Sequence, residues 1–221
     1  MLILAFDTAT PAVTVALHDG RRTLAQESVI DARRHGELLA PLIARVLAAG
    51  GAEPGDLTSV AVGTGPGPYT GLRAGLATAQ ALGHALGIGV AGVCTLDVIA
   101  AEARASAAGR EFLVATDARR REVYWARYSP GGERIGDPQV SDPDQVPAGC
   151  PVAGEGPSLH PVLGADGRSI EPRYPAAATL AEMASQRAAA DGAAEPPRPL
   201  YLRRPDAREP GRPKRVLGRS R

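Results

Sequence analysis

The sequence predicts an α/β protein of two related lobes, and two observations support that prediction. Strand-like and helix-like segments alternate along the chain, which favours mixed sheets covered by helices. In addition, residues 2–7 and the returning segment 13–17 resemble residues 112–117 and 123–128, at a constant offset of 110 residues (117 against 7, 123 against 13). An internal duplication explains this repeat, although two ordinary hairpins that happen to align are the alternative.

The first copy continues with helices and strands. Residues 36–49 place leucine, isoleucine and valine on one helical stripe before Gly50-Gly51, which predicts a helix whose start Pro41 should kink or shorten. The elements expected next are a strand at 59–63, a helix at 70–86, a strand at 89–93 and a helix at 95–107. Glycine inside a helix costs about 1 kcal/mol relative to alanine, so Gly71, Gly75 and Gly83 predict close approach to another part of the fold or to a partner.

The second copy begins near Arg110. Thr179-Leu-Ala-Glu182 is a capping box that predicts a helix to Ala190, while Gly154-Glu-Gly156 is interpreted as a plain turn. The repeat therefore predicts an N-terminal lobe at 1–108, a C-terminal lobe with a return helix at 109–204, and a tail at 205–221.

The chain of 221 residues is long enough for one large domain or two small ones, and its charge is uneven. Residues 198–221 hold nine Lys/Arg and two Asp/Glu, so this end carries +7 and, since the whole chain carries +1, the rest carries −6. Such an end can contact RNA phosphates or an acidic partner. A solvated, disordered terminus is the alternative.

A glycine-rich loop, Gly63-Thr-Gly-Pro-Gly-Pro-Tyr-Thr-Gly-Leu-Arg73, joins a predicted strand to a long helix. Anion sites are built from such parts, but Pro66 and Pro68 lack the amide hydrogen that donates to an anion. Arg73 opposes the helix dipole, which predicts a carboxylate, phosphate or carbonyl partner for it. A structural turn with a solvated arginine is the alternative.

Asp7-Thr-Ala-Thr10 places a carboxylate and two hydroxyls at the end of the first strand. Such a turn can hold a phosphate or a hydrated Mg²⁺, and Asp117, followed by 119–121, is its counterpart in the second copy. Two facing turns predict a vestigial phosphate or nucleotide cleft formed by Asp7, Thr8, Thr10 and Asp117. Ordinary turn formation by Asp and Thr is the alternative.

Other motifs predict neither a metal site nor a catalytic nucleophile. Cys94 and Cys150 form no CxxC and are expected to be buried thiols, and His35 is followed by Leu39 where an HxxxH pair needs a second histidine. The N-terminus has no basic region before its apolar run, and the apolar window 85–101 is interrupted by glycines and Asp97, so a cytoplasmic protein without a membrane segment is expected.

Four motifs together closely resemble the TsaB (YeaZ) family over the chain up to about Arg204. They are Asp7-Thr-Ala-Thr10, Gly65-Pro-Gly-Pro-Tyr-Thr-Gly-Leu-Arg73, Asp117-Ala-Arg119 before Glu122-Val-Tyr124, and Pro199-Leu-Tyr-Leu-Arg203. The resemblance implies a two-lobed fold of the actin, sugar-kinase and Hsp70 ATPase type, with duplicated ribonuclease H-like lobes. It also implies an accessory subunit of tRNA threonylcarbamoyladenosine synthesis, related to glycoprotease-like proteins.

The partners implied by this resemblance are a longer catalytic paralogue with an HxxxH metal pair (TsaD type) and a small pathway ATPase (TsaE type). ATP and a metal, Mg, Zn or Fe, are expected in the partner subunit, with no cofactor held firmly by this chain. The chain alone can pair with itself, and tRNA contact is expected through the complex or the basic tail.

In this family the first two helices pack against those of the paralogue. Carried onto this sequence, the implied interface is His35, Leu38, Leu39, Leu42, Ile43, Val46, Tyr69, Thr70, Gly71, Arg73 and Gly75. The implied function is a noncatalytic scaffold and activator. An independent small ATPase or kinase that uses Asp7 is the alternative, while a peptidase has neither metal ligands nor a nucleophile in its favour.

Overall fold

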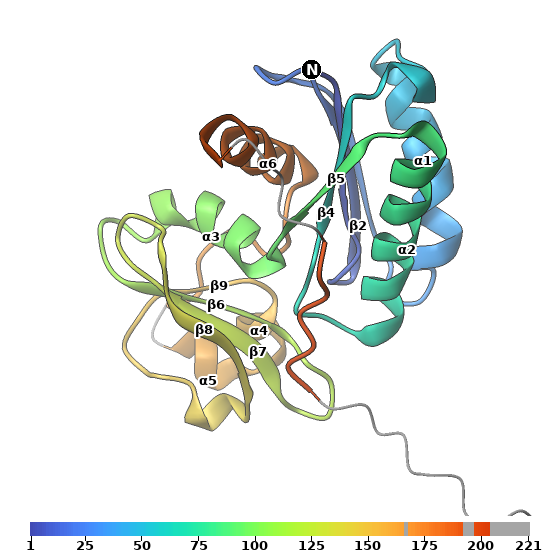
Figure 1. Ribbon diagram of the computed structural model, residues 1–221. Helices are drawn as coiled ribbons and strands as arrows, with labels where there is room; N and C mark the ends of the chain where they lie inside the picture. Colours follow the sequence, from blue (N-terminus) through green and yellow to red (C-terminus); the bar gives the residue numbers. More distant parts are fainter. Residues whose placement is uncertain (166–167, 192–196, 204–221) are drawn as a thin grey trace, which may run out of the picture.

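Two mixed sheets form the framework of the protein (Figure 1). The computed structural model describes residues 1–165, 168–191 and 197–203. The strands are β1 (Ile3–Asp7), β2 (Ala12–His18), β3 (Thr23–Ile30), β4 (Ser59–Gly63), β5 (Gly89–Val93), β6 (Phe112–Asp117), β7 (Val123–Tyr128), β8 (Arg134–Ser141) and β9 (Val152–Ala153). The sheet orders are β3-β2-β1-β4-β5 and β8-β7-β6-β9.

The two sheets share one topology. In each, three antiparallel strands form a meander, and the first strand of the copy pairs in parallel with a later one, β1 with β4 and β6 with β9. The meanders include β3 and β8, which the sequence analysis did not predict. Shared topology at this level supports the internal duplication read from the sequence.

The helices are α1 (His35–Ala49), α2 (Tyr69–Leu86), α3 (Thr95–Ser106), α4 (Gly156–Leu159), α5 (Pro161–Gly164) and α6 (Ala177–Asp191). The helices α1 and α2 cover one face of the first sheet and α6 covers the other (Figure 1). The helix α3 packs on the second sheet and contacts α6, so these two helices lie between the sheets, while α4 and α5 lie on the far side of the second sheet.

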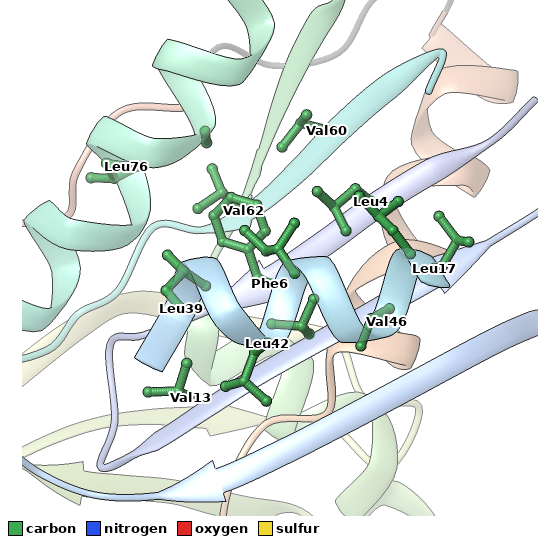
Figure 2. Close-up of a cluster of buried hydrophobic side chains, with 14 of the residues drawn as sticks. Leu4, Phe6, Val13, Leu17, Leu39, Leu42, Val46, Val60, Val62 and Leu76 are labelled. Atoms are coloured by element: carbon green, nitrogen blue, oxygen red, sulfur yellow. The ribbon is translucent and has the colours of Figure 1, made fainter. Parts of the chain in front are cut away.

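The largest core lies between the first sheet and the pair α1 and α2 (Figure 2). Leu4 and Phe6 of β1 point into it and meet Leu39 and Leu42 of α1, all at most 2% exposed. The apolar stripe of α1 is therefore directed at the sheet. Pro41 lies on the exposed side, inside the helix, so the prediction that it shortens the start of the helix is wrong.

The return helix α6 begins at Ala177, so the capping box predicted at Thr179 is not its start. Instead, the Ala176 amide donates to Glu102 Oε1 at 3.2 Å and the Ala177 amide donates to Thr14 Oγ1 at 3.1 Å. Partners distant in the sequence cap this helix, which a local motif cannot reveal.

The predicted N-terminal lobe 1–108 holds the first sheet, and 109–204 holds the second, but α6 packs on the first sheet. The predicted tail at 205–221 lies outside the described residues. Among the helices that the structure describes, none has the length and apolar character needed to cross a membrane.

Candidate functional site

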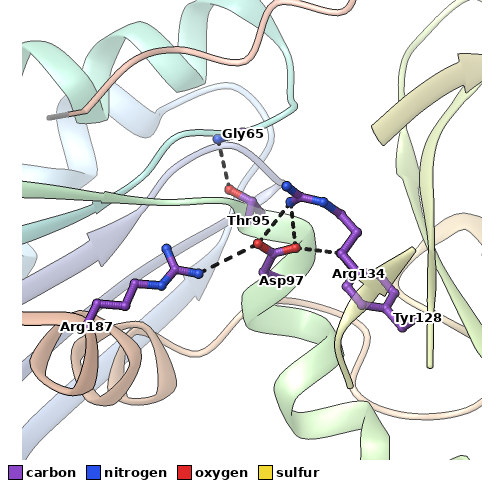
Figure 3. A network of polar contacts seen from close by, with 6 residues as sticks. All are labelled: Gly65, Thr95, Asp97, Tyr128, Arg134 and Arg187. Carbon is purple, nitrogen blue, oxygen red and sulfur yellow. Dashed lines mark hydrogen bonds and ion pairs between the residues drawn. The ribbon is translucent and has the colours of Figure 1, made fainter. Parts of the chain in front are cut away.

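Asp7 is fully buried and both of its carboxylate oxygens are hydrogen-bonded. Oδ1 accepts from the Ala9 amide and Oδ2 from the Thr95 hydroxyl, each at 2.6 Å. Thr95 in turn accepts from the Gly65 amide at 3.1 Å, a contact visible in Figure 3. Burial raises the pKa of Asp7 despite the bonds from Thr95 and Ala9, which lower it. Thr95, at the start of α3, thus links the glycine loop to Asp7.

The two threonines of the turn also bond within the protein. Thr8 donates to the Gly71 carbonyl at 2.7 Å, the Thr10 hydroxyl accepts from the Ala12 amide at 3.3 Å, and the Thr10 carbonyl meets His35 Nε2 at 2.8 Å. Both threonines are 2% exposed. In this structure the turn therefore presents no solvent-exposed side-chain oxygen to a phosphate, and the nucleotide cleft stays an untested prediction.

The helix glycines are explained by close approach within the fold. A Cβ at Gly71 or Gly75 would overlap atoms of Thr8, and one at Gly83 would overlap Val90. A Cβ at Gly63 would likewise overlap the Asp7 carboxylate, and one at Gly67 would overlap the Ala9 carbonyl. The α2 helix and the glycine loop thus press directly on the Asp7 turn and β5. Gly75 therefore lies on the buried side of α2, where an added Cβ would meet Thr8, and its expected place in a partner interface stays an untested prediction.

The predicted interface residues divide into two groups. Buried beneath the helices are His35, Leu39, Leu42, Ile43, Val46, Gly71 and Gly75. Leu38 is half-buried, and Tyr69, Thr70 and Arg73 are exposed. The second group is accessible to another chain in this structure, whereas the first group packs beneath the helices.

Alanines make up much of the exposed face of these helices, an exposure that the sequence analysis did not predict. Both helices expose alanine at four-residue spacing: Ala40, Ala44 and Ala48 on α1, and Ala77, Ala81 and Ala85 on α2. Residues at this spacing lie on one face of a helix, and small side chains there allow another helix to approach closely. The spacing was available in the sequence, but only the structure separates the buried glycines from these exposed alanines.

Arg73 has an aromatic partner. Its guanidinium carbon lies 3.8 Å from the centre of the Tyr69 ring, and the Tyr201 ring packs on Tyr69 at 5.4 Å. The predicted carboxylate, phosphate or carbonyl partner is therefore not what the structure shows; the ring quadrupole stabilises the cation. Tyr69 and Tyr201 remain 43% and 46% exposed, so the stack lies on the surface at the start of α2.

The segment at 197–203 crosses from one lobe to the other (Figure 1). The Leu200 amide donates to the Thr64 carbonyl of the glycine loop at 2.9 Å. Arg203 donates to the Ala118 carbonyl at 3.1 Å and forms an ion pair with Glu122, both in the hairpin between β6 and β7. This segment therefore ties the glycine loop to the second lobe.

A second tie between the lobes centres on Asp97 of α3 (Figure 3). Its carboxylate accepts from the Tyr128 hydroxyl at 2.9 Å and from Arg134 at 2.8 Å, and Arg187 of α6 lies 3.9 Å away. The pKa of Tyr128 is raised by burial and by the neighbouring Asp97 charge. These groups join α3, the second sheet and α6.

Asp117 does not lie where the repeat predicted. In the first lobe, Ile3 and Ala5 of β1 pack toward α6, and Asp7, two residues on, shares that inner face of the sheet. In the second lobe, Leu113 and Ala115 of β6 instead pack on the outer face of their sheet. Because strand side chains alternate, Asp117 shares the outer face. The strand register also differs between the two lobes. Asp7 pairs with Thr14, whereas Asp117 pairs with Val123, so the second turn is one residue shorter. The predicted constant offset of 110 residues is therefore wrong.

The turn Gly154-Glu-Gly156 is more than a plain turn. Gly154 has φ of +94°, and a Cβ there would overlap the Ala115 carbonyl of β6. Glu155 is 3% exposed and accepts from the Asp117 amide at 3.3 Å, and burial raises its pKa. The second lobe thus has its own glycine loop behind its first strand.

The described residues contain no group of three or more His, Cys, Asp or Glu side chains that could hold a metal ion. His35 is 8% exposed, and its Nε2 is hydrogen-bonded to the Thr10 carbonyl. Cys94 is buried, as expected, but Cys150 is only half-buried.

These two mixed sheets of related topology make the protein a two-lobed α/β protein. A family model described as TsaD, tRNA N6-adenosine threonylcarbamoyltransferase, matches residues 28–153, more than half of the chain. An uncharacterized protein of Mycobacterium tuberculosis H37Rv is 46% identical over 211 residues, covering 93% of each chain. The structure of YeaZ from Pseudomonas aeruginosa is 28% identical with a TM-score of 0.77, covering 91% of this chain and 99% of that one.

A further relative is the tRNA threonylcarbamoyladenosine biosynthesis protein TsaB of Escherichia coli K12. It is 39% identical over 129 residues, which covers 58% of this chain and 55% of that protein. On these matches, the chain belongs to the TsaB (YeaZ) family.

Proposed function

We propose that this protein is the noncatalytic scaffold and activator of the complex that forms N6-threonylcarbamoyladenosine in tRNAs reading ANN codons. The names of the TsaB relatives support a role in this pathway. In the proposal, the chain pairs with a catalytic, metal-binding paralogue of TsaD type. ATP and the metal belong to that partner, and a small TsaE-type ATPase joins the assembly.

The observation that carries the proposal is the exposed face of α1 and α2. The buried side of each helix is fully used by the first sheet, while the outer side presents alanines at four-residue spacing. Tyr69 and Arg73 lie at one end of this face, and Tyr and Arg are residue types enriched in binding hot spots. Such a surface fits a partner that offers helices of its own, or a second copy of this chain when the partner is absent.

The state of Asp7 weighs against the alternative of an independent ATPase or kinase. Both carboxylate oxygens of Asp7 accept hydrogen bonds from the protein, and the residue is fully buried. Mg²⁺ and phosphate ligands need solvent-accessible groups, so nucleotide binding here would require the turn to open.

The test is assembly with the HxxxH-bearing paralogue from the same organism, measured by size exclusion and calorimetry. Ala81→Arg places a long cation on the exposed face of α2 without touching the core, and it should weaken the heterodimer at least about tenfold. The matched control is Ala101→Arg on the exposed side of α3, which should leave assembly unchanged. Equal binding by Ala81→Arg and the wild type would count against this surface, and ATP hydrolysis by the chain alone would favour the alternative.

A further inference from the structure

The side chain of Thr116 in β6 is buried without a hydrogen-bond partner. Thr116 is 2% exposed, and its Oγ1 finds no donor or acceptor among the residues that the structure describes. Because strand side chains alternate, Thr116 shares the inner face of β6 with Phe112 and Val114, which pack against α3. A buried hydroxyl without a partner destabilises the folded state. The arrangement that buries Thr116 therefore carries a free-energy cost that contact with water would remove.

The segment 197–203 crosses the end of β6 at this position (Figure 1). Leu200 packs against the cluster on the inner face of β6, the face that holds Thr116. Three residues later, Arg203 donates to the Ala118 carbonyl at 3.1 Å. Since Ala118 lies two residues beyond Thr116, these two contacts lead the segment across the end of the strand in which Thr116 is buried.

Contacts near the surface hold the segment in place. The Tyr201 ring packs on the Tyr69 ring at 5.4 Å, and Tyr201 remains 46% exposed. The side chains of Arg203 and Glu122 form an ion pair and are 24% and 38% exposed. Partly exposed ion pairs contribute little to stability. The segment can therefore detach at a lower free energy than the sheets unfold.

We infer that residues 197–203 form a lid that opens over the end of β6 while both lobes stay folded. Opening lets water bond to the Thr116 hydroxyl, which offsets part of the contacts that the lid loses. Closing restores the bond from the Leu200 amide to the Thr64 carbonyl of the glycine loop, at 2.9 Å. The lid thus controls the access of solvent to the inner face of β6 beside the glycine loop. This inference does not depend on the proposed function.

The experiment follows exchange of the Leu200 amide hydrogen in the full chain by NMR, at a series of low urea concentrations. A lid that opens alone exposes little surface, so this exchange should depend weakly on urea, whereas the amides of β1 should show the strong dependence of global unfolding. Thr116→Val removes the unpaired hydroxyl at nearly constant volume and should slow Leu200 exchange about fivefold, because it favours the closed lid. Tyr201→Ala should speed this exchange about tenfold, because the ring contact is lost.

A matched pair of variants tests the anchor at the other end of the lid. Arg203→Ala and Arg127→Ala each remove an ion pair of the second lobe, with Glu122 and Glu111 respectively. Arg203→Ala should speed Leu200 exchange about threefold, and Arg127→Ala should leave it unchanged. Leu200 exchange that is unprotected, or that shares the urea dependence of the β1 amides, would overturn the inference. An unchanged rate in Thr116→Val would also overturn it, since the hydroxyl would then be buried in both states.

Discussion

The Asp7 turn and the Asp117 turn share one hydrogen bond of the aspartate and differ in the other. In each, Oδ1 of the aspartate accepts from the amide two residues on, at 2.6 Å in the first lobe and 2.7 Å in the second. The second oxygen of Asp7 binds buried Thr95, whereas that of Asp117 pairs with the exposed Arg119 guanidinium at 3.1 Å. One local motif thus closes the core of one lobe and supports a charged surface in the other.

The helices on the outer faces of the two sheets also differ between the lobes. The first sheet carries helices of 15 and 18 residues, α1 and α2, while the second carries α4 and α5 with four residues each. Only a long helix offers several turns of exposed surface to a partner helix. The outer surface of the first lobe is therefore formed by longer helices than that of the second.

The largest expected effect tests whether the two glycine loops are equivalent. Gly63→Ala drives a methyl group into the Asp7 carboxylate, and Gly154→Ala combines overlap with the Ala115 carbonyl and a positive φ. Each should lower the free energy of unfolding by about 3 kcal/mol, measured by urea denaturation. Gly36→Ala is the control, because nothing lies within 4 Å of its added Cβ, and it should be neutral or stabilising. A small loss of stability in Gly154→Ala would show that the second loop accommodates an added methyl group that the first loop cannot.

An intermediate effect should distinguish the two aspartates. Asp7→Ala leaves the buried Thr95 hydroxyl and the Ala9 amide without an acceptor and should cost about 3 kcal/mol. Asp117→Ala removes a side chain that is 16% exposed, and water can replace it, so about 1 kcal/mol is expected. Equal losses in chemical denaturation would refute the contrast between a buried and a surface turn.

The smallest effect concerns the two thiols and needs no mutation. Burial raises the pKa of Cys94 to about 12, whereas Cys150 is half-buried. Because the thiolate is the reactive form, a disulfide reagent at pH 8 should modify Cys150 in the native protein and Cys94 only after unfolding. The raised pKa also means that Cys94 stabilises the native state below pH 9.0 and loses that contribution as pH rises toward 12. Rapid native labelling of both thiols would contradict this burial.

Much of the fold could be predicted from the sequence. Elements with strong local patterns, such as the apolar stripe of α1 or the strand before the glycine loop, lie within a residue or two of their expected bounds. The strands β3 and β8 escaped prediction because their side chains are mostly half-buried or exposed, which leaves no clear apolar alternation. The candidate site was less predictable, since Thr95 and Glu155 reach their partners through contacts distant in the sequence.

The sequence by itself determined the family, the duplication and the identity of the motifs, because these depend on residue types and spacing along the chain. Only the tertiary structure decided the roles of those motifs. It directed Gly71 and Gly75 of α2 to Thr8 and placed the Arg73 guanidinium over the Tyr69 ring. It also set Asp117 on the face opposite to that of Asp7, and made the turn after Asp117 one residue shorter. The physical reason is that burial, strand register and electrostatic partners arise from packing between distant segments, and a one-residue shift in a strand reverses the face of every side chain.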